Sequence, residues 1–113
     1  MSRQRGFIYD AHLPDVSEPK PALVVSSDAV NRGMSPVVAQ VTTTERVRML
    51  PTSVVLQAGE GGVDRRSYVL CHELVTLDED QLAEDPWGPR IPLAKLIAVE
   101  RALMATFDIP FEE

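Results

Sequence analysis

Short stretches with the hydrophobic pattern of β-strands fill the first two thirds of the chain, and one helical pattern lies close to its C-terminal end. Residues 6–13 alternate large apolar side chains with a mixed second side, and this period of two is typical of a half-buried strand. Four more segments rich in β-branched residues follow, at residues 22–27, 36–44, 51–57 and 67–77. Proline, glycine and charged residues separate them. The pattern therefore predicts a small antiparallel barrel or a strongly curled sheet.

Residues 92–107 carry the helical pattern, and Pro92 suits its first turn because that position has no intrahelical N–H bond to lose. A stripe of large apolar side chains is expected to pack this helix on the sheet. The stripe consists of Leu93, Leu96, Ile97, Leu103, Met104 and Phe107. Glu100 lies in its middle, where an unpaired carboxylate is costly, so it must find a cation, reach the edge or carry a proton. A structural salt bridge is the favoured outcome.

The length of 113 residues and a hydrophobic content of 44% predict one domain over residues 1–113 with a single compact core. The sequence has no run of eighteen apolar residues and no basic-then-apolar leader, so we expect a soluble and unprocessed chain. Cys71 is the one cysteine. It excludes an internal disulfide and fits a cytoplasmic location.

The net charge of −6 argues against a general nucleic-acid binder, because phosphate contacts depend on lysine and arginine. The charge is unevenly spread, however. Residues 1–58 hold six Lys or Arg against five Asp or Glu, a balance of +1, and the rest of the chain holds five against twelve, a balance of −7. Any RNA surface is therefore expected in the N-terminal half, while the acidic remainder mainly favours solubility.

Six segments, taken in order, resemble the MazF/PemK family of toxins from bacterial toxin–antitoxin pairs. They are RGFIYDAHLP, SEPKPALVVSSDAVNR, VTTT, LPTSVVL, SYVLCHELVTLDEDQL and the final helix. Each element alone is common, but together they cover about the whole chain in the family's order and spacing. The resemblance implies a mainly β domain with a C-terminal helix, built on a small SH3-like antiparallel barrel of about five to seven strands.

The same resemblance implies a function. It implies a homodimeric toxin that cleaves single-stranded RNA at short motifs, stops growth by blocking translation and is inhibited by a cognate antitoxin. The substrate's own 2′-hydroxyl is then the nucleophile, and the products carry a 2′,3′-cyclic phosphate and a 5′-hydroxyl. Such chemistry needs a proton acceptor, a proton donor and a positive group for the phosphorane oxygens, but no metal or other cofactor.

Glu18, Lys20 and Thr42 match the positions that the family uses for catalysis. Lys20 stands where the family usually has an arginine, so it delivers charge to a phosphate without the planar fork that holds two oxygens. Strand parity puts Thr42 on the same side as Gln40, where its hydroxyl is expected to bind the scissile phosphate. Glu18, the candidate proton acceptor, shares a proline-stiffened loop with Lys20, and such loops present charged groups from a scaffold.

Other residues are expected to contact the substrate. They are Ser26, Asn31, Arg32, Arg46, Arg48 and His72. The arginines are expected to grip phosphates and Asn31 to read a base edge. His72 is a candidate substitute for a missing acid or base, because histidine is a common general acid or base, although a histidine on a strand is more often packed or on the surface. Base stacking is expected to be minor, because aromatic residues are few and the core takes most of them.

Two other functions fit the same sequence. A CcdB-like toxin of the same fold would poison DNA gyrase through its C-terminal helix, without needing Glu18, Lys20 and Thr42. A non-catalytic SH3-like interaction module is favoured by the acidic pI of about 4.8 and by the lysine in place of arginine. A nuclease assay on single-stranded RNA in EDTA separates all three functions.

Overall fold

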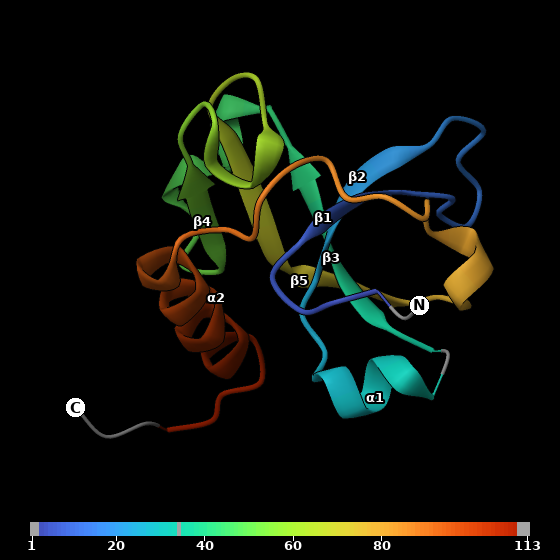
Figure 1. Cartoon of the computed structure of the whole chain (residues 1–113). Coiled ribbons are helices and arrows are strands. Elements are labelled where there is room, and N and C mark those ends of the chain that lie inside the picture. The colour runs from blue at the N-terminus through green and yellow to red at the C-terminus, as the bar shows by residue number, and fades with distance from the viewer. Residues whose placement is uncertain (1–2, 34, 111–113) are drawn as a thin grey trace.

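The computed structural model describes residues 3–33 and 35–110, and Figure 1 shows a twisted sheet with a long helix on one flank and a short helix at one end. The strands are β1 (Ile8–Ala11), β2 (Lys20–Val24), β3 (Val37–Thr42), β4 (Ser53–Leu56) and β5 (Ser67–Thr76). The helices are α1 (Asp28–Arg32) and α2 (Leu93–Thr106), and the short 3-10 turns are η1 (Glu45–Met49), η2 (Glu60–Gly62) and η3 (Glu79–Gln81). Neither α-helix in this part of the chain is long and apolar enough to span a membrane.

The five strands form one antiparallel sheet in the order β1, β2, β3, β5, β4. Over the described residues the outer strands β1 and β4 do not pair with each other, so the sheet is open and is not a closed barrel. A bridge between Ala11 and Leu82 brings the chain after β5 back to the outer edge of β1. The predicted architecture, mainly β with a C-terminal helix, is confirmed, and the sheet is curled and open where a barrel would be closed.

Apolar side chains are buried on both faces of this sheet, because successive residues of a strand point to opposite sides. Ile8 of β1 joins a core that also contains Val99 and Ala102 of α2. Tyr9 and Ala11 of β1 join a second core on the other face. The alternating residues of segment 6–13 therefore contribute side chains to two cores, whereas the sequence predicted a single core.

Helix α2 packs on β4 and β5. The face that it buries is narrower than the sequence predicts and carries smaller side chains. Val99 and Ala102 are its buried residues, and a small alanine lets the helix lie close to the sheet. The predicted stripe is wrong in part, because Leu93, Ile97 and Phe107 are exposed. The stripe groups large side chains correctly on one side of the helix, but the sheet contacts the neighbouring side.

Glu100 finds a cation, as the helical pattern predicts. Its Oε2 lies 2.5 Å from Nη2 of Arg5, which belongs to the segment before β1. The side chain of Glu100 keeps 46% of its surface exposed. An ion pair this open to solvent is worth about 1 kcal/mol or less, so it orients the N-terminal segment on α2 more than it stabilises the fold.

Candidate active site

Lys20 and Thr42 come together at one end of the sheet through strand pairing. Lys20 is the first residue of β2 and Thr42 is the last residue of β3. Ala22 of β2 pairs with Gln40 of β3, and continuing this antiparallel register by two residues sets Lys20 opposite Thr42. Directly opposed residues of neighbouring strands share a face of the sheet. Thr42 in turn pairs with Tyr68 of β5, so the three residues form a row across the sheet.

A cleft of about 250 Å³ opens at this end of the sheet. Its lining residues are Lys20, Pro21, Val41, Thr42, Thr43, Asp64, Ser67 and Trp87. Two of the three predicted catalytic residues, Lys20 and Thr42, therefore line one cleft. Three further lining residues come from parts of the chain that are far away in the sequence: Asp64 and Ser67 from the start of β5 and the loop before it, and Trp87 from the segment before α2.

Lys20 presents its charge to solvent at the mouth of this cleft. Its side chain is about half exposed, and its Nζ lies 4.0 Å from Oε2 of Glu18, whose side chain is 80% exposed. The structure thus brings Glu18 next to Lys20 but does not place it in the cleft lining. A contact this long and exposed is weak. Both side chains are therefore free to rearrange when a charged ligand enters.

The hydroxyl of Thr42 is fixed by the turn that follows β3. Its Oγ1 accepts a hydrogen bond from the backbone N–H of Thr44 at 3.2 Å and donates to Oγ1 of Thr44 at 3.1 Å. A hydroxyl has two acceptor lone pairs and one donor, and the donor is the part that rotates. Thr42 can therefore turn its O–H toward a phosphate oxygen without losing the contact from the Thr44 backbone.

A second cleft, of about 330 Å³, lies on the neighbouring strands. Its lining is Arg48, Met49, Val55, Gln57, Arg66 and Tyr68. Val55 is paired with Tyr68, so this cleft continues the row that contains Lys20 and Thr42. It brings the predicted Arg48 together with an arginine, Arg66, that the sequence analysis did not select.

Tyr68 ties the turn η1 to the sheet beside this second cleft. Its hydroxyl donates to Oε2 of Glu45 at 2.5 Å. This hydrogen bond, together with burial and the nearby Glu45 charge, raises the pKa of Tyr68 above its usual value. Tyr68 therefore keeps its proton, and its hydrogen bond to Glu45 has a structural role. The predicted Arg46 lies in η1 with its side chain exposed.

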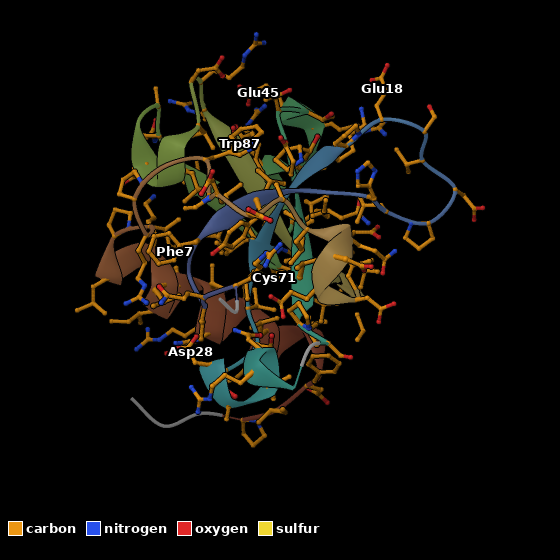
Figure 2. The ribbon with its side chains drawn as sticks, turned by 45° about the vertical axis from the view of Figure 1, so that its right-hand side comes forward. Phe7, Glu18, Asp28, Glu45, Cys71 and Trp87 are labelled. Atoms are coloured by element: carbon orange, nitrogen blue, oxygen red, sulfur yellow. The ribbon has the colours of Figure 1, made fainter. Side chains whose placement is uncertain are left out.

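Three predicted substrate residues lie at the other end of β2, on and just before α1. Figure 2 shows Asp28 of α1 at the far end of the molecule from Glu18 and Glu45. Asn31 is only 1% exposed, and its amide donates to the carbonyl oxygen of Ser26 at 3.1 Å. The hydroxyl of Ser26 contacts Oδ1 of Asn31 and accepts from the Val37 N–H at 2.9 Å.

That Asn31 reads a base edge stays a prediction, and in this conformation its amide group is buried and already hydrogen-bonded. The same holds for Ser26 as an RNA contact, since its hydroxyl joins α1 to β3. Arg32 is exposed at the end of α1 but shares its end of the molecule with neither cleft.

His72 lies on a bulge of β5 and not in either cleft. The pairing of β3 with β5 shifts between Ala39 and Gln40, where β5 carries extra residues 71–73. Nδ1 of His72 lies 2.7 Å from Oγ1 of Thr52, and its Nε2 lies 3.7 Å from Glu73. Burial raises the pKa of the neighbouring Cys71 thiol to about 12. Cys71 is therefore an inert core residue and not a nucleophile.

Several cleft residues could not be selected from the sequence. Asp64, Ser67 and Trp87 reach the cleft through long-range packing, and no local pattern marks them. Thr43 follows Thr42 and becomes a lining residue because β3 ends there. Over residues 3–33 and 35–110, no three His, Cys, Asp or Glu side chains gather as a metal site.

The fold is that of solved endoribonuclease toxins. An endoribonuclease in complex with its cognate antitoxin from Mycobacterial species matches with a TM-score of 0.83 and 28% identity, over 98% of this chain and 100% of that one. The Mycobacterium tuberculosis toxin MazF-mt6 matches with a TM-score of 0.78 and 27% identity, over 92% and 98% of the two chains. Endoribonuclease EndoA of Bacillus subtilis (strain 168) is 35% identical over 88 residues, which are 72% of this chain and 75% of the relative.

Residues 4–107 match the family described as PemK-like, MazF-like toxins of type II toxin–antitoxin systems. The chain belongs to this family. The family and the enzyme class predicted from the sequence, a toxin that is an endoribonuclease, are confirmed by these matches.

Proposed function

We propose that this chain is a single-domain toxin that cleaves single-stranded RNA by attack of the substrate's 2′-hydroxyl on the adjacent phosphorus, without a metal ion. The bond from phosphorus to the 5′-oxygen breaks, which leaves a 2′,3′-cyclic phosphate and a 5′-hydroxyl. The observation that carries the proposal is the placement of Lys20 and Thr42 in one exposed cleft. A cation and a hydroxyl at this spot suit the extra negative charge of a phosphorane.

The roles follow from the chemistry of each side chain. Lys20 stabilises the phosphorane oxygens, and its ammonium is the candidate proton donor to the leaving 5′-oxygen. Thr42 donates a hydrogen bond to a non-bridging oxygen. Glu18 accepts the proton of the attacking hydroxyl, because it is the carboxylate beside Lys20 and is mobile enough to reach the ribose. No step requires a metal-bound water.

The test is cleavage of single-stranded RNA in excess EDTA, with the product ends identified by mass spectrometry. We expect cutting at the same rate with and without EDTA, and no cutting where the attacked ribose is replaced by deoxyribose. Thr42→Val removes the hydroxyl at nearly constant volume and is expected to slow turnover. Thr76→Val, an exposed threonine at the end of β5 on the same sheet but outside the cleft, is the matched control. Intact RNA in the presence of gyrase inhibition would favour the gyrase-poison function instead.

The role of Glu18 has a separate test. Glu18→Gln keeps the size and polarity of the side chain but cannot accept a proton, so we expect turnover to fall by about 10²–10⁴ if Glu18 is the general base. Asp15→Asn, an exposed carboxylate on the same loop, is the matched control. An unchanged rate for Glu18→Gln would move the base to another group, and His72 would be tested next.

Two partners belong to the proposal. The solved complex with a cognate antitoxin supports an antitoxin for this chain, and the two arginines of the second cleft suit an acidic, hydrophobic tail that excludes RNA when bound. Complex formation that leaves cleavage unchanged would contradict this partner. We place the activity in the bacterial cytoplasm.

We also propose that the chain works as a homodimer. The large apolar side chains left exposed along α2 support this, because single-chain proteins rarely expose such a set without a partner. Light scattering at micromolar concentration is expected to give twice the 12.5 kDa mass of one chain. A monomer that is fully active on RNA would contradict the dimer.

A further inference from the structure

Trp87 is the one large aromatic side chain that lines the Lys20 and Thr42 cleft among the described residues. It is 40% exposed. The two tyrosines, Tyr9 and Tyr68, are almost fully buried in contrast. Figure 2 shows Trp87 in the same half of the molecule as Glu45 and Glu18, away from α1. A ligand that covers the exposed part of the ring would remove apolar surface from water, which is favourable.

Three contacts hold Trp87 in one orientation. Its backbone N–H donates to the carbonyl oxygen of Ile8 at 2.7 Å. Its indole Nε1–H donates to Oδ1 of Asp10 at 2.9 Å, so the polar edge of the ring is anchored on β1. Gly62 (φ +92°) packs against its carbonyl group so closely that a Cβ there would come within 2.5 Å of the Trp87 carbon and oxygen. The ring is therefore prepositioned, and little side-chain entropy remains to be lost on binding.

The charges of the cleft divide it into two sides. Lys20 supplies the positive charge for a phosphate. Asp64, two residues after the Gly62 that contacts Trp87, puts a carboxylate on the lining. A carboxylate repels a phosphate but accepts hydrogen bonds from the N–H groups of a nucleobase. The phosphate is thus favoured beside Lys20, and the base is favoured beside Trp87 and Asp64.

We propose that Trp87 is the stacking platform for a nucleobase next to the scissile phosphate, and that Asp10 positions its ring. This inference rests on the proposed RNA cleavage and adds a residue that selects single-stranded substrate, because a base must leave its duplex stack to lie on the indole. A stacking platform takes any base with an open π-face, so specificity among bases comes from groups such as Asp64 and not from Trp87 itself.

Trp87 is the only tryptophan in the chain, so its fluorescence reports directly on the ring. The probe is a short single-stranded RNA that the wild type cleaves, made uncleavable by deoxyribose at the attacked position. We expect this RNA to quench the fluorescence on binding. The same RNA with an abasic site at the stacked position should bind without that quenching. If the uncleavable RNA did not quench the fluorescence, or if an abasic site at each position in turn left the quenching intact, the proposal would be overturned.

Variants give the second measurement. Trp87→Leu keeps apolar volume but removes the π-face, and we expect its KM for RNA to rise about 5- to 150-fold with kcat within a few fold. Trp87→Phe should recover most of the loss, while Asp10→Ala should show a smaller loss because the ring is freed. Phe7→Leu, a half-buried aromatic residue outside the cleft, is the matched control.

The two measurements are combined by testing Trp87→Leu and the wild type on RNA that carries the abasic site. If Trp87 stacks on that base, the two proteins should have equal KM on abasic RNA, because the contact is absent in both. A merely structural loss in Trp87→Leu would persist on abasic RNA and overturn the proposal. Wild-type protein that cuts no RNA would instead refute the proposed function. The abasic scan measures binding of uncleavable RNA, so it tests the stacking separately from cleavage.

Discussion

The two ends of the sheet hold the same kinds of polar side chain and use them differently. At the end where β2 begins and β3 ends, Lys20 and Thr42 face a cleft and remain accessible to a ligand. At the other end, Ser26 and Asn31 are turned inward and hydrogen-bond to each other and to the backbone of β3. The comparison shows that residue type does not separate a binding group from a structural group. The difference is whether the side chain has hydrogen-bonding capacity that the fold leaves accessible to a ligand.

The energetics of the α1 end explain why its polar groups are satisfied. A buried amide or hydroxyl without a partner costs about 1–3 kcal/mol, so a fold that buries Asn31 must supply its hydrogen bonds. The cleft end has no such need, because Lys20 is half exposed and the Thr42 hydroxyl already bonds Thr44 and can still turn its O–H toward a ligand. Accessible polar groups at a strand end are therefore available for chemistry, and buried ones at a helix start are committed to the fold.

The largest expected effect is at the cleft end, where Lys20→Ala removes the positive group that we propose to stabilise the scissile phosphate. Removing one such stabilising donor typically lowers kcat by about 10²–10³, or roughly 3–4 kcal/mol. We expect this loss in turnover with a smaller change in KM, measured on a fluorescent single-stranded RNA. The unfolding midpoint should stay near that of the wild type, because the Lys20 side chain is half exposed and its ion pair is weak.

Lys20→Arg is the control for this experiment. An arginine restores the two-pronged phosphate contact, so the variant should retain or exceed the wild-type rate. Wild-type turnover in Lys20→Ala would show that the cleft end does not carry the catalytic charge, and the contrast between the two ends would fail.

The next effect belongs to the α1 end and falls on stability instead of rate. Asn31→Ala leaves the backbone carbonyl of Ser26 and its hydroxyl without their partner, and we expect about 1–3 kcal/mol loss in the free energy of unfolding. Urea denaturation measures the loss, and kcat on RNA should be unchanged for the folded fraction. A stable Asn31→Ala protein with impaired RNA binding would return Asn31 to the substrate surface.

The strands of the fold could be predicted because their cause is local. The alternation in residues 6–13 marks β1, and the β-branched segments overlap the other strands, although the bounds differ. β3 begins directly after Pro36, but β2 begins at Lys20, two residues before its predicted segment, and includes Pro21. The packing face of α2 could not be predicted, since helical periodicity shows which side chains group together but not which group the sheet contacts. Val99 and Ala102 contact it, in place of Leu93 and Ile97.

The part of the site that depends on strand register could be predicted from the sequence. The family resemblance selected Lys20 and Thr42, and the β2 to β3 register places them opposite each other. It could not show that Asn31 folds back on Ser26, because that depends on the first turn of α1. Trp87 meets the cleft only through contacts with β1 and the Gly62 loop, and no sequence pattern encodes such contacts.

A smaller effect is expected in the second cleft, which flanks the catalytic row. Arg48→Ala should weaken RNA binding while turnover at saturating RNA stays nearly intact, because Arg48 lines the second cleft and is proposed to contact a phosphate, not the reacting atoms. Each phosphate contact on a single strand contributes about 0.7 to the slope of log K against log salt, so the slope should fall by about that amount. Equilibrium binding of uncleavable RNA between low and moderate salt measures this slope.

The smallest effect is expected for Arg32 at the α1 end. Arg32→Ala removes the exposed cation of the α1 end, and binding, salt slope and turnover should all match the wild type, because Arg32 lines neither cleft. Arg48→Ala and Arg32→Ala remove the same charge from the same chain, so a change in net charge alone would affect both equally. A slope that falls only for Arg48→Ala therefore assigns the effect to position. A slope that falls equally for Arg32→Ala would bring the α1 end into the RNA path, and in a dimer that would place α1 of one subunit beside the cleft of the other.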